Sequence, residues 1–190
     1  MIVLITLAVI VVIGIIGVSF ITGSYNTLVS SDLNVENQWG KVQSAYERRL
    51  DLLPNLAATV KGSADFEQET LVEVAKARGG LRVANNPAQL EEANRPVMSM
   101  MAGMMTYTEQ YPEIKSTEAF KGLMDEIAGT ENRIKWERDA YNDQVRDYKL
   151  QVKRYPTNLI AGMFGFEESK WDSFTALENA SVAPTIDFSD

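Results

Sequence analysis

The sequence of 190 residues contains no cysteine and no histidine. The lack of cysteine excludes disulfide bonds and thiolate nucleophiles. The lack of histidine excludes an imidazole acid or base and histidine-ligated metal centres, and together the two absences exclude Cys/His zinc sites. Glycine-rich phosphate-binding motifs are also missing. We therefore expect a protein that is not an enzyme and that carries no cofactor.

Charge is absent from the first 31 residues, because all 26 acidic and 18 basic residues lie between Asp32 and Asp190. The net charge of the whole chain is −8. A chain of this balance lacks the basic face that contact with phosphates requires. We therefore expect no nucleic-acid partner.

The uncharged start is a candidate membrane anchor. Residues 1–21 are almost all aliphatic, and about 20 such residues in a helix cover the roughly 30 Å of a bilayer core. No basic residue precedes the run and no clear cleavage site follows it, which favours an uncleaved anchor over residues 1–22. A cleaved signal peptide and a buried core helix are the alternatives. The membrane-spanning residues that we single out are Ile2, Leu4, Ile10, Gly14, Gly17 and Phe20.

The orientation of this anchor depends on the nearest basic residues, which begin with Lys41 and Arg48. The positive-inside rule then favours an external N-terminus and a cytoplasmic body in the bacterial inner membrane. These bases lie near the limit of the stretch over which the rule acts. Gly14 and Gly17 are three residues apart, which does not match the GxxxG motif for helix pairing.

After the anchor, a seven-residue repeat predicts one long helix from Tyr25 to Val60. Residues three and four apart share a helix face, so two neighbouring rows make one apolar seam. The repeat stays in register through Pro54, which predicts a kink there and an end at residues 61–63. The rows are Tyr25, Asp32, Trp39, Tyr46, Leu53 and Val60, beside Leu28, Val35, Val42, Arg49 and Leu56.

A second long helix is predicted after the possible cap Thr117, with an end at Tyr155 because Pro156 follows. Its row is Phe120, Ile127, Ile134, Tyr141, Tyr148 and Tyr155. Two shorter helices lie between the long ones. The first, about 65–78, should turn Phe66, Leu71, Val74 and Ala77 inward and weaken or end at Gly79-Gly80. The second, about 88–110, should pack through Leu90, Val97, Met101, Met104 and Tyr111.

These helices predict an all-α fold with three parts. The anchor, residues 1–22, continues into an up-and-down antiparallel four-helix bundle over residues 23–156. Residues 157–190 form an apolar juxtamembrane segment and an extended tail. Residues 181–190 either add as a strand to another chain or fray.

The juxtamembrane segment follows the helix that returns to the anchor, and it is apolar and uncharged. It either rests on lipid or a neighbouring subunit, or it folds back and caps the open end of the bundle. The contact residues that we single out are Asn158, Leu159, Ile160, Met163, Phe164 and Phe166.

Arg49 is a charge on the apolar seam and needs a partner. Placing Tyr25 opposite Tyr155 in an antiparallel pair puts Arg49 near Glu131, so we expect a structural ion pair; binding of an anionic ligand is the alternative. We expect Asp51, Asn55 and Asn142 to form hydrogen bonds around Pro54. The methionines at 98, 100, 101, 104 and 105 surround too much of their helix to hold one copper ion, and they indicate adaptable packing.

The motifs Tyr25-Asn26-x-Leu28-Val29, Arg49-Leu50-Asp51-Leu52-Leu53-Pro54-Asn55-Leu56, Tyr141-Asn142-Asp143 and Tyr155-Pro156-Thr157-Asn158-Leu159 occur in this order. In these motifs the chain resembles the LemA family of bacterial membrane proteins over nearly its whole length. The resemblance implies an anchored helical bundle without a settled activity. Relatives in that family take part in magnetosome-membrane formation or lie beside membrane metalloproteases. The structural motif residues are Arg49, Asp51, Pro54, Asn55, Tyr141 and Asn142.

The sequence therefore favours a non-enzymatic scaffold that is anchored in the membrane and self-associates into a homo-oligomer, shaping or organising that membrane. Its partners would be the lipid bilayer and further copies of itself. The alternative is an accessory or adaptor protein of a membrane protease or envelope-stress system, with a membrane protein as partner.

Overall fold

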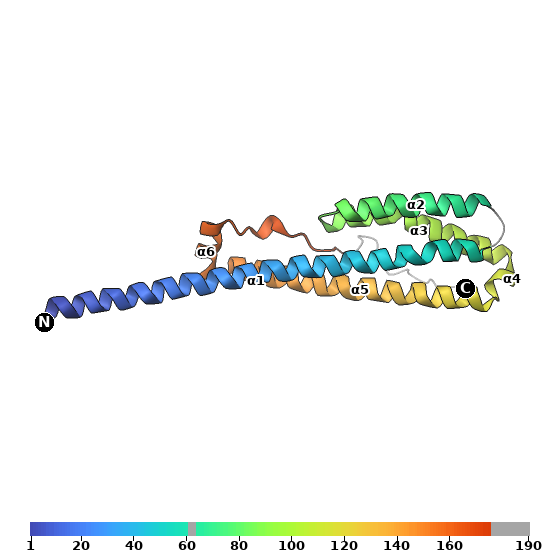
Figure 1. Cartoon of the computed structure of the whole chain (residues 1–190). Helices are drawn as coiled ribbons and strands as arrows, with labels where there is room; N and C mark the ends of the chain where they lie inside the picture. The colour runs from blue at the N-terminus through green and yellow to red at the C-terminus, as the bar shows by residue number, and fades with distance from the viewer. Residues whose placement is uncertain (61–63, 176–190) are drawn as a thin grey trace, which may run out of the picture.

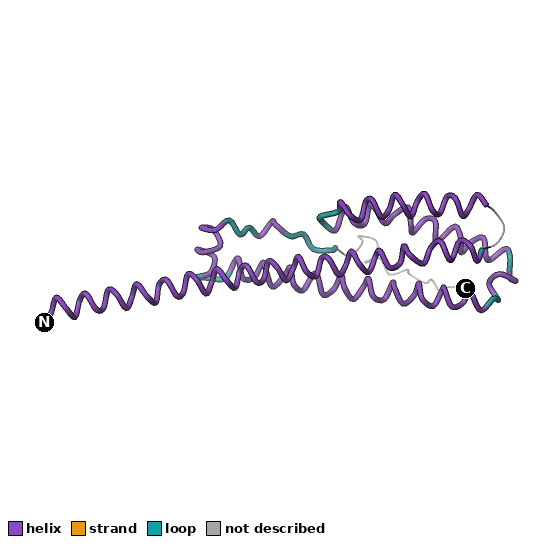
Figure 2. Tube along the Cα trace, viewed as in Figure 1, coloured by secondary structure: helices purple, strands orange, loops and turns teal. Residues whose placement is uncertain are grey.

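The computed structural model describes residues 1–60 and 64–175, and over these ranges it contains helices and no strand. Figure 1 shows one long helix whose second half is covered by the others, and Figure 2 shows how little of the described chain is loop. The predicted all-α fold is confirmed. The elements are α1 (Ile2–Thr59), α2 (Ala64–Val83), α3 (Pro87–Gln110), α4 (Pro112–Lys115), α5 (Glu118–Lys153), α6 (Thr157–Phe164) and the short 3-10 helix η1 (Glu168–Lys170).

Helix α1 joins the apolar start to the bundle without a break, as predicted. It has 58 residues and passes through Pro54 before it ends at Thr59. Proline removes one backbone hydrogen bond from a helix, but the residues after it are held by packing, because Leu56 and Ala57 are buried. The expected stop at residues 61–63 lies outside the described residues.

Helices α2 and α3 form a hairpin. Helix α3 begins close to the predicted residue 88: the Asn86 side chain accepts a hydrogen bond from the Gln89 backbone N–H at 3.0 Å, and Pro87 opens the helix. This is the arrangement that Asn at an N-cap and Pro at the first helical position favour.

The first short helix does not end at Gly79-Gly80, because α2 continues to Val83. A Cβ atom on Gly80 would lie 2.7 Å from the Cβ of Ala93 on α3. Glycine therefore allows the two helices to approach closely at this point. The burial of Leu81 in the core offsets the helix-propensity cost of about 1 kcal/mol per glycine.

The inward face of α2 also differs from the prediction. Leu71 is 52% exposed, whereas Thr70, Val74, Ala77 and Leu81 are buried. Their spacing of four, three and four residues defines one helix face, and Leu71 lies one position away from it. The prediction stopped at residue 78 and so missed Leu81, which fixes the phase. The side chain of Phe66 lies outside the described part.

The C-terminal end of α3 differs in a smaller way. Leu90, Val97 and Met104 are buried as predicted, and Met101 is partly buried. Tyr111 is 40% exposed, because it is the residue after the helix and its φ of −126° takes it off the helical face.

Helix α5 begins as predicted, with Thr117 accepting a hydrogen bond from the Phe120 backbone N–H at 3.2 Å. It ends at Lys153, two residues before the predicted end, and the extended backbone of Arg154 turns the chain away. Tyr155 is therefore 77% exposed and leaves the apolar row, while the five earlier members of the row are buried. The ring of a proline clashes with the backbone of the residue before it and disfavours the helical conformation of that residue. Pro156 therefore explains why the helix ends before Tyr155.

The bundle is built around the antiparallel pair of α1 and α5. The α2–α3 hairpin packs on the C-terminal part of α1, and the chain after α6 runs back beside the same pair (Figure 1). Leu28, Val35, Val42, Arg49 and Leu56 are all at most 2% exposed, so the companion row of the seam is fully inside. Burial of each large apolar side chain stabilises the bundle by about 1.5–3 kcal/mol.

Candidate functional site

Arg49 joins three helices at the centre of the bundle. Its side chain is 2% exposed, and its guanidinium donates to the Glu131 carboxylate of α5 and to the Asn94 side-chain oxygen of α3. The ion pair with Glu131 that the register predicted is confirmed. The contact with Asn94 was not predicted, although Asn94 interrupts the apolar face of α3 between Leu90 and Val97 and could have indicated it.

The setting of Arg49 is structural. Its Nε is buried and has no hydrogen-bond partner among the described residues, and the two Nη atoms are occupied by this chain's own oxygens. The guanidinium also lies 5.2 Å from the ring centroid of Tyr46. Burial raises the pKa of Tyr46, and the charges of Arg138 and Arg49 oppose that rise. An anionic ligand would have to displace Glu131 to reach Arg49.

A second polar group is buried between α1 and α5 around Glu137, which is 1% exposed. The Gln38 amide donates to the Glu137 carboxylate at 2.5 Å, and Arg133 pairs with the same carboxylate at 2.5 Å. These bonds satisfy a charge that would otherwise be costly to bury.

An open groove lies between α1 and α5 beside Glu137, with a volume of about 750 Å³. Its wall on α1 includes Lys41, Ser44 and Arg48, and its wall on α5 includes Glu126, Thr130 and Arg133. Next to the groove, Trp136 is 59% exposed, and the Arg133 guanidinium lies 5.0 Å from its ring centroid. A large aromatic side chain stacked with arginine on an open surface is typical of protein contacts.

Asp51 and Asn142 do not meet at Pro54, so the prediction that they form hydrogen bonds there is wrong. Asp51 pairs with Arg78 of α2, and both side chains are exposed. Asn142 binds the segment 171–175 instead: its amide donates to the Phe174 carbonyl at 3.0 Å, and its oxygen accepts from the Phe174 backbone N–H at 2.8 Å. These partners are distant in sequence, and a helix pattern gives no signal for them.

Asn55 is exposed and lies with Ile114 and Glu113 at a shallow cleft near the α3–α5 connection. The prediction of a hydrogen bond from its side chain at Pro54 has no support in the described contacts. Its backbone carbonyl accepts from the Thr59 hydroxyl at 2.6 Å, which is a bond within α1.

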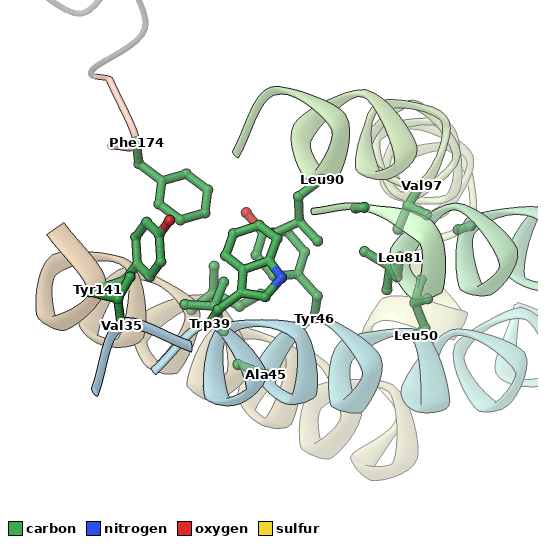
Figure 3. Packing of buried hydrophobic residues seen from close by; sticks show 14 of the residues in the cluster. Val35, Trp39, Ala45, Tyr46, Leu50, Leu81, Leu90, Val97, Tyr141 and Phe174 are labelled. Atoms are coloured by element: carbon green, nitrogen blue, oxygen red, sulfur yellow. The ribbon is translucent and has the colours of Figure 1, made fainter. Parts of the chain in front are cut away.

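Tyr141 belongs to an aromatic cluster that closes the bundle below the α2–α3 hairpin. Figure 3 shows Phe174 directed toward Tyr141 and Trp39. The ring centroid of Phe174 lies 5.5 Å from that of Tyr141 and 6.1 Å from that of Trp39, and the Arg138 guanidinium lies 4.4 Å from the Phe174 ring. Burial raises the pKa of Tyr141 far above its ordinary value, so its phenol stays neutral.

We call residues 166–175 the return strap, because they run back from α6 along α1 and α5. Tyr148 donates to the Glu167 carbonyl at 3.1 Å, and the Trp171 indole donates to the Asp32 carboxylate at 2.8 Å. Lys170 pairs with the same Asp32 at 2.6 Å. Burial, together with the nearby carboxylates of Asp32 and Glu167, raises the pKa of Tyr148 to about 12. The strap thus replaces the α2–α3 hairpin as cover for the membrane end of the bundle.

Helix α6 folds back onto the middle of α1. Ile160 and Ala161 are buried against Leu28, whereas Leu159, Met163 and Phe164 are exposed by 57%, 73% and 50%. Asn158 is exposed and Phe166 is partly buried against the same cluster. The segment therefore caps this end of the bundle, and the outer side of α6 keeps an exposed apolar surface.

The anchor residues all lie on the exposed N-terminal part of α1: Ile2, Leu4, Ile10, Gly14, Gly17 and Phe20. Among the described residues α1 is the helix long and apolar enough to cross a membrane. A Cβ on Gly14 or Gly17 would meet open space. The helix fits a single-pass membrane anchor.

The candidate metal ligands are the acidic and methionine side chains, and their positions in the bundle decide whether they can converge. Within residues 1–60 and 64–175, no three acidic side chains converge in a way that could hold a metal ion. The methionines of α3 also diverge, because Met104 is buried while Met98 and Met105 are exposed by 44% and 40%. Methionine is flexible and adapts to irregular packing, which suits this position between core and surface.

Comparison with known proteins places these features in a family. The sequence model described as the LemA family matches residues 38–188. Protein LemA of Metamycoplasma hominis is 24% identical over 140 residues, which cover 73% of this chain and 64% of that protein. Magnetosome protein MamQ 2 of Paramagnetospirillum magneticum is 31% identical over 68 residues, 36% of this chain. Magnetosome protein MamQ of Magnetospirillum gryphiswaldense is 26% identical over a stretch of the same length.

The alignments with both MamQ proteins cover only a quarter of the length of those relatives. The family match, in contrast, includes residues 38–59 of α1 and all of α2 to α6, and it exceeds half of the chain. The motifs around Arg49 and Tyr141 lie inside it. The chain therefore belongs to the LemA family.

Proposed function

We propose that this protein is a non-enzymatic scaffold, anchored in the bacterial inner membrane, that self-associates into a homo-oligomer and organises the membrane around it. The observation that carries the proposal is the continuity of α1, which extends from the apolar anchor into the centre of the bundle. An uninterrupted helix transmits position and direction from the bilayer to the bundle, whereas a flexible linker would not.

The surface that we assign to self-association is the α1–α5 groove with Trp136 beside it. The α2–α3 hairpin and the return strap do not line this groove. The groove contains charges of both signs, from Lys41 and Arg48 to Glu126, and these suit contact with a second copy of a chain that carries both signs. Trp136 supplies the large aromatic area that dominates the energy of many interfaces.

Resemblance to proteins named for the magnetosome supports a role in organising membrane. The proposal therefore extends from self-association to membrane shape, in the sense that a lattice of rigid, anchored rods fixes the distance between neighbouring anchors.

For orientation we propose an external N-terminus and a cytoplasmic bundle. Lys153 and Arg154 lie far from the anchor in sequence, but Val152 packs in the same cluster as Leu28, at the end of the bundle that adjoins the anchor. Basic residues near the span favour the cytoplasmic side. A single-cysteine variant, Ser116→Cys, tests this: an impermeant maleimide added to intact cells should label it only after the inner membrane is opened.

The test of the function is the particle size of the full chain in mild detergent and in native membrane discs. A defined oligomer is expected, and Trp136→Ala should reduce it to smaller species while the helix content stays unchanged. Lys135→Ala is the matched control, because Lys135 is the adjacent exposed residue and points away from the groove side lined by Arg133. A monomer of the unaltered chain in both media would overturn the scaffold and leave the adaptor role.

A further inference from the structure

Helix α6 lies at a defined depth relative to the anchor. The apolar run ends at Ile21, and its roughly 20 residues span about 30 Å, the thickness of the hydrocarbon core. Tyr25 is four residues further along α1, or about 6 Å along the helix axis, which places it in the headgroup region. The Phe164 ring of α6 lies 4.9 Å from the Tyr25 ring, and the Phe166 ring lies 5.9 Å from it.

The direction of α6 fits that depth. In Figure 1, α6 runs across the line of α1 at the membrane end of α5, and not along it. If α1 crosses the bilayer close to its normal, α6 then lies close to the membrane plane. Its C-terminal end is fixed by Gly165 at φ +76° and by the Phe166 N–H, which donates to the Ala161 carbonyl at 3.0 Å. Glycine tolerates this left-handed conformation without strain.

The outer side of α6 is apolar and carries no charge. Leu159 and Met163 are four residues apart and so share a face, opposite to the one that buries Ile160 and Ala161. From Tyr155 to Phe166 there is no Asp, Glu, Lys or Arg. Tyr155, Leu159, Met163 and Phe164 expose apolar surface on this side, and through Phe164 that surface reaches Tyr25, which follows the anchor on α1.

From this continuity we propose that α6 is an interfacial helix. Its outer side contacts lipid of the leaflet from which α1 emerges. Tyr25 and Tyr155 take positions that suit aromatic residues at the headgroup level. Arg154 is exposed and forms no ion pair with any other described residue, so it is available to lipid phosphates. The helix fixes how deep α1 sits and how the bundle is tilted.

The proposal rests on the membrane anchoring in the proposed function but not on self-association. The experiment uses the full chain in vesicles of phosphatidylcholine and phosphatidylglycerol. The chain has no cysteine, so single-cysteine variants carry one fluorophore each. Met163→Cys reports on α6, Val12→Cys on the anchor, and Ser116→Cys, at the opposite end of the bundle, on the aqueous phase.

Lipids with a nitroxide close to the headgroup should quench the label at residue 163 several-fold more than the label at residue 116, and lipids with a nitroxide deep in the acyl chain should quench the label at residue 12. Iodide in water should quench the label at residue 116 more. The same result is expected in the Trp136→Ala background, because lipid contact does not require a second copy.

Three results would overturn the inference. A label at residue 163 that iodide quenches and lipid nitroxide does not would place α6 in water. A label protected from both quenchers would place a neighbouring subunit there. Loss of lipid quenching at residues 12 and 163 together would remove the anchor as well, whereas loss at residue 163 alone would remove only the interfacial helix.

Discussion

Arg49 of α1 and Glu131 of α5 form an ion pair with unequal burial, because the arginine side chain is 2% exposed and the glutamate side chain is 42% exposed. The two partners therefore depend on the pair to different extents. When Glu131 is removed, the buried guanidinium of Arg49 is left without a counter-charge and without water. When Arg49 is removed, the partly exposed carboxylate of Glu131 can be solvated.

This asymmetry predicts the outcome of a mutant cycle. Glu131→Ala should destabilise the bundle by about 3 kcal/mol, because it leaves a buried unpaired charge, and Arg49→Met should cost less because methionine fills the site. The double variant should be more stable than Glu131→Ala alone. Urea unfolding of the full chain in detergent, followed by circular dichroism, measures these free energies. Additive losses, in this cycle or with Arg49→Ala, would show that the pair is not coupled.

The adjacent glycines of α2 predict opposite results for the same substitution. Gly80→Ala should destabilise the bundle, because the new Cβ meets the Ala93 Cβ at 2.7 Å. Gly79→Ala is the matched control: its Cβ meets nothing within 4 Å, so it should stabilise by about 0.5–1 kcal/mol through helix propensity. Thermal unfolding of both variants tests the contrast.

The cause can be isolated with a compensating change. Ala93→Gly in the Gly80→Ala background removes the atom that clashes and should recover most of the lost stability, less the propensity cost of about 1 kcal/mol for the new glycine. Equal effects of Gly79→Ala and Gly80→Ala would contradict the close approach of α2 and α3.

The two bonds between Asn142 and Phe174 predict that Asn142 holds the return strap. Asn142→Ala should lower the free energy of unfolding by about 1–2 kcal/mol, because it leaves the Phe174 backbone unpaired. Hydrogen exchange should accelerate at residues 171–175 more than in α3. Asp143→Ala, a change at the exposed neighbour on α5, should leave exchange of the strap unaltered. Similar exchange in the two variants would show that the strap is held by other contacts.

Tyr148 predicts a loss of stability at alkaline pH. Its folded-state pKa is raised from 10.0 to about 12, so the unfolded chain releases the proton first as pH rises. The stability that this group contributes is therefore complete below pH 10 and is lost between pH 10 and about 12. Raised pKa values of Tyr46 and Tyr141 act in the same direction.

The variant Tyr148→Phe separates this contribution. It should cost about 1 kcal/mol at neutral pH, because the hydrogen bond to the Glu167 carbonyl is lost. Between pH 10 and 12 its stability should fall less steeply than that of the unaltered chain. Denaturant unfolding at a series of pH values measures both slopes, and parallel curves would show that Tyr148 does not ionise differently in the two states.

Much of the fold follows from local pattern. The seven-residue rows of α1 and α5 predicted both long helices and their pairing register closely enough to place Arg49 beside Glu131. Thr117 predicted the start of α5 through capping, which involves only neighbouring residues. The errors at Gly79-Gly80, Leu71 and Tyr155 concern places where packing or a following turn outweighs the propensity of the residue itself.

The candidate sites were less predictable, because their partners are distant in sequence. Asn142 was assigned to the surroundings of Pro54, yet it binds Phe174, which is 32 positions further along the chain. Asn94 was not assigned, although it completes the environment of Arg49. The exposure of Trp136 depends on which side of the α1–α5 pair the α2–α3 hairpin covers. The periodicity of a single helix does not indicate that side.

The sequence by itself determined that this chain is helical, that its first 22 residues suit a membrane, and that α1 continues through Pro54, because hydropathy and helix periodicity are properties of contiguous residues. Only the tertiary structure decided that the return strap closes the membrane end of the bundle and that α6 keeps one apolar side inside and one outside. Those outcomes depend on packing between segments that are far apart in the chain, and such packing is selected by the fit of whole surfaces.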